Sequence, residues 1–353
     1  MRIQSLRIEN LRNLERAEIS PHPRFNVFFG GNGAGKTSIL ESIVVLSRGR
    51  SFRTTQASEL IGRSGKLFRV YAETVSQDRV VRKQGLERSK SHWRARKDGQ
   101  DLAQLSQLTR VLPLVLMEPN SHLLVSGAPE IRRKYLDWGL FHVEHEFLDT
   151  YRRFAKILKQ RNAALRFRQD KVLESIDEVF CELGMRLDDM RKTYCRGIAR
   201  HVQALLERLS PDMDGFSLQY SRGWTRPTLK ESLLDNRDSD LLRGATGSGP
   251  HRGDISLLFH DTPARNLLSR GEQKILAAAL LLSQAAILSQ NGEKPMILLD
   301  DLASEFDQSH FENVLEQALE IGSQVWLTGI RKCQNDAEHK VFHVEHGRVQ
   351  EMV

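Results

Sequence analysis

A glycine-rich stretch near the N-terminus has residue types and spacing suited to phosphate chemistry. The residues "GGNGAGKT" follow the apolar run Phe25–Phe29 and precede Ile39, Leu40 and Ile43, whose spacing predicts a helix. Glycines at these positions let backbone N–H groups face a phosphate at the N-terminus of that helix. A lysine then meets the β- and γ-phosphates, and a threonine hydroxyl meets Mg²⁺. The stretch therefore predicts a nucleoside triphosphate site.

ATP and Mg²⁺ are the cofactors expected at this site. Lys36 is the predicted catalytic cation, and Thr37 is a predicted ligand of Mg²⁺. The residues expected to surround the phosphates are Gly30, Gly31, Asn32, Gly33, Ala34, Gly35, Lys36 and Thr37.

Two adjacent aspartates near the C-terminus are the predicted acidic partner of this loop. They follow Met296–Leu299, a short apolar run typical of a strand that is covered on both faces. Asp300 is predicted to hold Mg²⁺, either directly or through another ligand of the ion, and Asp301 is the predicted group that polarises the attacking water. Many strands end in aspartate at a turn, so this pattern gains its weight from the phosphate loop.

The stretch "LSRGEQKIL" is a polar turn that opens a long apolar helix about 25 residues before the aspartates. Its residues Ser269, Arg270, Gly271 and Gln273 resemble the signature of ABC-type ATPases. The heads of those proteins pair head to tail, so that each signature caps the γ-phosphate held by the other subunit. A second interpretation stays open, because Ser269 and Glu272 also form the pattern of a capping box.

Other residues extend and qualify this resemblance. Ser304 and Asp307 of "SEFD" resemble the D-loop that lies across the same interface. Transporter-type heads carry glutamate where this chain has Asp301, and a histidine where it has Thr328 and Gly329. The chain is therefore expected to hydrolyse ATP slowly, as a weak DNA-dependent ATPase in which ATP acts as a dimerisation switch.

Composition sets limits on the class of protein. The chain has 353 residues, 40% of them hydrophobic and 27% charged, which allows a sizeable core and two globular units. Lysine and arginine total 52 against 45 aspartates and glutamates, so the formal net charge of +7 favours polyanionic partners without proving one.

Targeting signals and cysteines indicate a cytoplasmic protein without a membrane partner. The N-terminus is charged throughout, which excludes a secretory signal. The apolar run 275–288 is interrupted by polar residues and is shorter than the ~20 residues that span a bilayer. Cys181, Cys195 and Cys333 form no CxxC pair, as is typical of a reducing compartment.

The N-terminal "LRIENLRNLERAEI" resembles the first strands of SMC-type chromosome-maintenance heads, in which the turn at Arg12 and Asn13 lies near the nucleotide. Those proteins insert hundreds of coiled-coil residues between the two half-sites, and this chain does not. The strings "RGRSFRTTQ", "APEIRRKYLDWG", "LKQRNAAL" and "GSGPHRGDI" resemble the RecF family of recombination mediators, in the same order over essentially the whole chain.

The resemblance to RecF implies a function in DNA repair and replication. It implies a cytoplasmic bacterial protein that binds gapped or stalled replication sites, with duplex DNA and single-strand/duplex junctions bound without sequence specificity. It further implies an ATP-dependent homodimer that works with RecR and RecO to place RecA on single-stranded DNA.

The expected fold class is α/β, with an ABC-type P-loop ATPase head that contains a mixed β-sheet. Residues 1–115 and 212–353 are predicted to form the ATPase lobe, and 116–211 a helical insertion without a long coiled coil. Two other classes stay open, namely the nucleotide-binding subunit of an ABC transporter and an SMC-like structural ATPase.

Two basic segments are candidates for contact with the DNA backbone. One holds Arg94, Arg96 and Lys97 beside a hairpin turn at Asp98-Gly99, and the other holds Arg152, Lys156 and Lys159 on a predicted amphipathic helix. Each run is also typical of a solvated face. The pentapeptide "FHVEH" occurs at 141–145 and 342–346, but its histidine spacing lacks the geometry of a zinc helix, and a metal site there is not expected.

Overall fold

The computed structural model describes residues 1–63, 65–76, 78–109, 112–331 and 338–352. It divides into two compact units, of which the first contains Met1–Ser121 and Ala278–Val353 and the second contains His122–Ala277. The second unit therefore ends later than residue 211, where the sequence analysis expected the insertion to end. Cys181 and Cys195 are free thiols, and Cys333 lies outside the described residues.

A mixed six-stranded sheet in the first unit carries the predicted phosphate loop and the aspartates. Its strand order is β15-β14-β3-β13-β12-β8, and all pairs are parallel except β14 with β15. The strands are β3 (Phe25–Phe29), β8 (Leu114–Met117), β12 (Met296–Leu299), β13 (Gln324–Gly329), β14 (Lys340–Glu345) and β15 (Arg348–Met352). The bounds predicted for β3 and β12 are confirmed.

A second six-stranded sheet in the same unit is entirely antiparallel, in the order β2-β1-β4-β5-β6-β7. Its strands are β1 (Arg2–Leu11), β2 (Leu14–Ile19), β4 (Leu67–Val75), β5 (Val81–Ser89), β6 (Trp93–Lys97) and β7 (Gln100–Asp101). The strands β6 and β7 turn at Asp98 and Gly99, whose φ values of 50° and 83° confirm the predicted hairpin.

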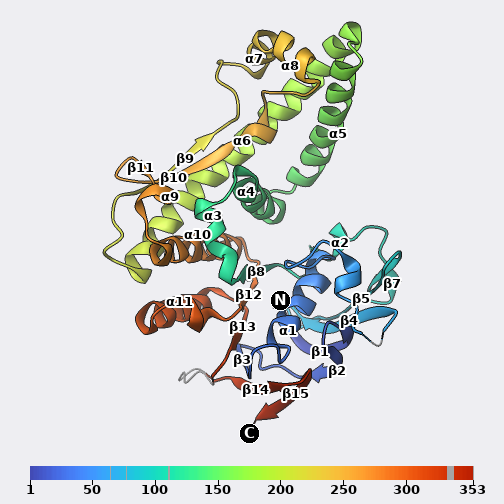
Figure 1. Ribbon diagram of the computed structural model, residues 1–353, viewed down its shortest axis with the longest axis vertical. Coiled ribbons are helices and arrows are strands. Elements are labelled where there is room, and N and C mark those ends of the chain that lie inside the picture. The colour runs from blue at the N-terminus through green and yellow to red at the C-terminus, as the bar shows by residue number, and fades with distance from the viewer. Residues whose placement is uncertain (64, 77, 110–111, 332–337, 353) are drawn as a thin grey trace. The chain divides into compact units, whose positions relative to one another are not determined.

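Helix α1 (Lys36–Arg48) contacts strands of both sheets and forms the centre of the first unit (Figure 1). Only Thr37 and Arg48 of its residues are not buried. A helix that is buried on nearly every side is fixed in place by the neighbours that cover it. This packing holds the N-terminus of α1 rigidly beside the glycine loop. The unit also contains α2 (Ser106–Thr109) and α11 (Gln308–Ile321).

The second unit is mainly helical. Its long helices are α4 (Pro129–Val143), α5 (Phe147–Arg166) and α6 (Asp170–Leu209), and α5 and α6 lie side by side (Figure 1). The shorter elements are α3 (Leu123–Ser126), α7 (Leu229–Asp235), α8 (Arg237–Arg243), α9 (Ala264–Leu267), β9 (Phe216–Ser221), β10 (Asp254–Phe259) and β11 (Thr262–Pro263).

The strands β9 and β10 explain why the second unit ends later in the chain than residue 211. Their alternating residues predict strands, and the sequence analysis assigned them to the ATPase lobe. They pair with each other and with β11 in a separate sheet. Helix α10 (Arg270–Gln290) begins in the second unit and continues into the first. Within the described residues, none of the helices has both the length and the apolar character needed to cross a bilayer.

Candidate nucleotide site

The glycine loop joins β3 to α1 in a conformation that requires glycine. Gly30 has a φ of 155°, and a Cβ atom there would lie 2.1 Å from the carbonyl oxygen of Val344. Gly35, at φ 119°, is the N-cap of α1 and leaves only 3.1 Å between such an atom and the Asn13 side chain. Beside Gly33, at φ 76°, a Cβ atom would meet nothing within 4 Å, so it would fill open space that the loop leaves for a ligand.

Lys36 points back into this loop. Its Nζ atom donates hydrogen bonds to the carbonyl oxygens of Gly30 and Gly31, at 2.8 and 2.9 Å. Burial lowers the pKa of Lys36, and the nearby charges of Asp301 and Asp300 raise it. The ammonium group therefore lies at the loop where the sequence placed it.

Asp300 is brought to the start of α1 because β12 runs parallel to its neighbours and ends at the same edge as β3. The Thr37 hydroxyl donates to Asp300 Oδ1 at 2.9 Å, across 263 residues of sequence. Burial raises the pKa of Asp300, whereas hydrogen bonds from Thr328 and Thr37 lower it. A hydroxyl and a carboxylate are oxygen donors that suit Mg²⁺, which takes its other ligands from phosphate and water.

Asp301 is held in the left-handed region, with a φ of 52°. Its backbone N–H donates to Thr328 Oγ1 at 2.9 Å. The Ser304 hydroxyl lies 2.8 Å from the Asp301 carbonyl oxygen and 2.9 Å from its Oδ2. Asp307, the other predicted D-loop residue, is the N-cap of α11 and accepts the N–H of His310.

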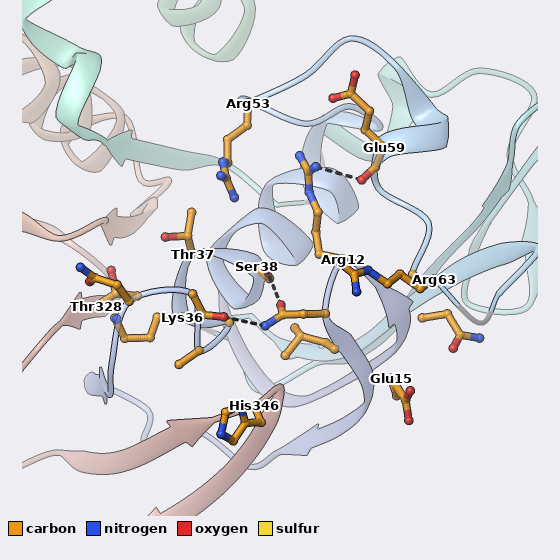
Figure 2. Close-up of a pocket in the computed structure, with 18 of the residues that line it drawn as sticks. Arg12, Glu15, Lys36, Thr37, Ser38, Arg53, Glu59, Arg63, Thr328 and His346 are labelled. Atoms are coloured by element: carbon orange, nitrogen blue, oxygen red, sulfur yellow. Dashed lines mark hydrogen bonds between the residues drawn. The ribbon is translucent and has the colours of Figure 1, made fainter.

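A cavity of about 1040 Å³ opens between these groups (Figure 2). Arg12 and Asn13, predicted to lie near the nucleotide, both line it. The Arg12 guanidinium is engaged by the buried carboxylate of Glu41, at 2.8 and 2.9 Å. Asn13 donates to the Gly33 carbonyl oxygen and accepts the hydroxyl of Ser38, so it supports the loop.

Several residues of the site were missed by the sequence analysis. Arg53 and His346 line the cavity, and the sequence analysis named them only as parts of "RGRSFRTTQ" and "FHVEH", without a role at the nucleotide. The sequence analysis noted Thr328 only because transporter-type heads have a histidine near this position. In the structure, Thr328 contacts both Asp300 and Asp301. Glu118 follows β8 directly, and an apolar run that ends in an acid is the same signal that marked Asp300.

The position of Glu118 follows from strand pairing. The Asp300 N–H donates to the Met117 carbonyl oxygen at 2.8 Å, so Glu118 and Asp300 leave neighbouring parallel strands at one edge. Ligands of open α/β sheets bind at this edge. Burial, and then the charge of Asp300, raise the pKa of Glu118 to about 7.

The signature residues are in the second unit, at the N-terminus of α10. The Ser269 N–H donates to Glu272 Oε2 at 2.7 Å, and the Glu272 N–H donates to Ser269 Oγ at 3.3 Å, so the capping box exists. Ser269, Arg270 and Gly271 are nevertheless exposed. Gln273 is buried and donates to the Leu268 carbonyl oxygen.

The two candidate DNA segments differ in how far their charges are neutralised. Arg94 and Arg96 both contact Asp101, at 3.0 and 2.7 Å, and lower the pKa of that carboxyl to about 2. Lys97 lies at the end of the same strand. On α5, Arg152, Lys156 and Lys159 are exposed at helical spacing, and the described residues give Lys156 and Lys159 no ion pair.

Residues of three of the RecF-type strings make ion pairs within the second unit, which we call the arginine network. Arg161 of "LKQRN" is fully buried and contacts Asp177 at 2.7 Å and Asp240 at 2.9 Å. Arg132 of "APEIRRKYLDWG" contacts Asp254 of "GPHRGD" through two bonds of 2.9 Å. These bonds join parts of the second unit that are far apart in the sequence.

Comparison with known proteins assigns the chain to a family. The RecF/RecN/SMC N-terminal domain family matches residues 2–351. A DNA replication and repair protein RecF from Stenotrophomonas maltophilia is 40% identical over 360 residues, which cover 99% of each chain. The chain belongs to the RecF family. This membership agrees with the resemblance seen in the sequence and separates the chain from transporter subunits.

Solved structures confirm the predicted α/β ATPase head. The recombination mediator protein RecF-ATP of the RecFOR pathway matches with a TM-score of 0.89 and 26% identity, covering 100% of this chain and 98% of that one. An Smc head bound to the C-winged helix domain of ScpA matches with a TM-score of 0.60 and 16% identity, covering 100% of this chain and 98% of that one, which shows the fold alone.

Proposed function

We propose that this chain is an ATP-dependent recombination mediator, which binds ATP with Mg²⁺ in the cavity and dimerises when ATP is bound. The observation that carries the proposal is the arrangement of Thr37, Asp300 and Asp301 at one edge of the parallel sheet, beside the glycine loop. The RecF relatives named above, one of them solved with ATP, support the same assignment.

Each side chain has a defined task in this proposal. Lys36 exchanges its bonds to the loop carbonyl oxygens for bonds to the β- and γ-phosphates. Thr37 and Asp300 hold Mg²⁺, which neutralises phosphate charge when it is bound. The Asp301 carboxylate orients the attacking water, and Ser304 holds that carboxylate.

The signature of a second copy completes the site in this proposal. Gly271 supports this contact, because a Cβ atom there would meet only Ser269 Oγ, at 4.0 Å. The fold of a single chain therefore leaves this face open for another group. An exposed helix N-terminus also attracts phosphate oxygens.

A mixture of two variants tests the dimer. Ser269→Arg should bind ATP nearly normally but fail to dimerise, and Lys36→Ala should fail because it loses ATP. A mixed dimer has one composite site with both lesions and one with neither, so mixing should restore part of the ATP-dependent dimer. Light scattering with ATP and Mg²⁺ measures this; dimerisation of Ser269→Arg alone would reduce the turn to a helix cap.

Asp301→Asn tests the slow ATPase that we propose. The variant should bind ATP and remain dimeric, because the phosphate contacts are kept and water activation is lost. We expect the hydrolysis rate to fall by about 10²-fold, as is typical for the loss of a general base. Phosphate release measures the rate, with and without DNA, and a normal rate would remove Asp301 from its role.

We further propose that DNA binds along α5 without base specificity. Arg94 and Arg96 already share Asp101, whereas Lys156 and Lys159 are exposed and unpaired in the described structure, so the lysines offer more charge to phosphates. We expect the Lys156→Ala/Lys159→Ala variant to lower the salt dependence of binding by about one to two counterions. The matched control is Arg94→Ala/Arg96→Ala, and anisotropy with gapped and duplex DNA measures both.

The cellular role belongs to the same proposal. RecR and RecO are the partners expected of a RecF-family protein, and RecA is the protein placed on single-stranded DNA. A cytoplasmic location is expected with them. An SMC-like structural role would instead require a long coiled coil, and the longest described helix, α6, packs within the second unit.

A further inference from the structure

Thr328, at the end of β13, has a hydroxyl that contacts both aspartates of the site. Thr328 Oγ1 lies 2.8 Å from Asp300 Oδ1, and it accepts the backbone N–H of Asp301 at 2.9 Å. The residue is fully buried, so water does not compete for these bonds. The register places Thr328 one residue beyond the pair of Leu299 with Leu327, directly beside the start of the Asp300-Asp301 turn.

The single proton of this hydroxyl can be assigned. Two acceptors lie within reach, namely Asp300 Oδ1 at 2.8 Å and the Leu299 carbonyl oxygen at 3.5 Å. The carboxylate is both closer and more strongly accepting. The proton therefore goes to Asp300, and a lone pair of the same oxygen receives the N–H of Asp301.

We propose that Thr328 is a positioning residue that fixes Asp300 and Asp301 in one arrangement. This inference rests on the proposed function, because it concerns the same ATP site. Thr37 also donates to Asp300 Oδ1 at 2.9 Å, and its oxygen can hold Mg²⁺ through a lone pair while it does so. Thr37 therefore links Asp300 to the metal, whereas Thr328, on the neighbouring strand, holds Asp300 Oδ1 and the backbone of Asp301 with one oxygen.

The backbone conformation of Asp301 is the second observation that supports a positioning role for Thr328. A residue other than glycine at φ 52° is strained and persists only where its surroundings hold it. The N–H of Asp301 has Thr328 as its acceptor, and the carboxylate has Ser304 as its donor. Without the Thr328 hydroxyl the turn loses its anchor, and the Asp301 carboxylate leaves the position in which it can orient water.

The test compares Thr328→Ser with Thr328→Ala, which differ only by the hydroxyl. We expect Thr328→Ala to lower kcat by about 10- to 100-fold with a KM within about threefold of the parent, because ground-state ATP contacts are kept. Thr328→Ser should retain most of kcat. Thr328→Val keeps the volume and should behave like Thr328→Ala. The matched control is Thr74→Val, which removes another buried hydroxyl of the first unit.

Hydrogen exchange at the Asp301 amide supplies a readout without ATP. The N–H should exchange at the parent rate in Thr328→Ser and at least about tenfold faster in Thr328→Ala, because only the hydroxyl accepts it. Parent kcat in both Thr328→Ala and Thr328→Val, or equal exchange in all variants, would overturn the inference. Failure of the parent to bind or hydrolyse ATP would instead overturn the proposed function, and the exchange rates would still decide the positioning role.

Discussion

The nucleotide site of the first unit and the arginine network of the second are both rich in charged residues, but they use them differently. In the network, the fully buried Arg161 contacts Asp240 and the Thr246 hydroxyl, both buried, and Asp177, which is mostly buried. In the site, the hydrogen bonds that the described residues give to Lys36 Nζ are two, both to carbonyl oxygens, at the wall of a large cavity. Charged groups whose partners are all internal hold a fold together, whereas groups that face open space are available to a ligand.

His251 illustrates the structural side of this comparison. The string "GPHRGD" resembles a catalytic cluster, but its histidine packs against the rings of Phe154 and Phe180 and contacts the Thr246 carbonyl oxygen. Burial lowers the pKa of His251 to about 4, so the ring is neutral at physiological pH. Arg191 contacts Pro250 of the same string and Asp137. These residues position one another, and none of them lines the nucleotide cavity.

Removal of Arg161 should have the largest effect on folding. Arg161→Ala leaves the buried carboxylate of Asp240 without its cation, and the loss of one partner of a buried pair costs about 3–5 kcal/mol. Urea denaturation measures the free energy of unfolding. The control is Arg94→Ala, whose pair with Asp101 is exposed and screened by water, so its loss should change the free energy of unfolding far less. Equal losses in the two variants would contradict the structural role of the network.

Lys36→Ala should weaken ATP binding and leave the stability of the fold nearly unchanged, in contrast to Arg161→Ala. ATP affinity should fall by at least about 100-fold, since the cation for the β- and γ-phosphates is lost. The free energy of unfolding should change by less than about 1 kcal/mol, because Lys36 is not part of a buried ion pair. Calorimetric titration and urea denaturation of the same sample measure both quantities, with the exposed Lys83→Ala as control. Unchanged ATP affinity would overturn the phosphate-loop assignment.

Local sequence patterns predicted the strands and loop that bear the motifs. The runs Phe25–Phe29 and Met296–Leu299 became β3 and β12 without a change of bounds, because each is short, apolar and bounded by turn residues. Thr328 and Glu118 were not predicted, because their roles depend on the strand order β3-β13-β12-β8. Parallel pairing joins residues hundreds of positions apart, and no local pattern contains that information.

The ion pairs of Arg94 and Arg96 with Asp101 were not predicted, for a different reason. The sequence analysis counted the charges along the segment and did not use the hairpin, which places Asp101 opposite Arg96 in the register of β6 and β7. The turn at Asp98-Gly99 had been predicted, so this pairing could have been inferred. The boundary between the two lobes could not have been inferred, because a strand pattern does not indicate which sheet the strand joins.

Glu118 extends the comparison between the nucleotide site and the arginine network. Its carboxyl is half-buried beside Asp300, and none of the described residues donates a side-chain hydrogen bond to it. Its pKa of about 7 lies above the ordinary value of 4.5, so the folded chain favours the protonated form. The stabilisation from that proton is complete below pH 4.5 and is lost as the pH rises through 7. The folded state is therefore penalised at alkaline pH, where the carboxylate is ionised beside Asp300.

Glu118→Gln removes the cost of the ionised carboxylate. We expect its effect to be smaller than the effects of Arg161→Ala and Lys36→Ala. The variant and the parent should unfold with similar free energies at pH 5, and the variant should be more stable on the order of 1–2 kcal/mol at pH 8. Urea denaturation at the two pH values, with EDTA present to exclude metal ions, measures the difference. Glu15→Gln is the matched control, because it makes the same change at an exposed carboxyl on the wall of the nucleotide cavity. A Glu118→Gln variant that loses stability at pH 8 would show that the carboxylate has internal partners, which would place Glu118 with the buried ion pairs rather than with the site.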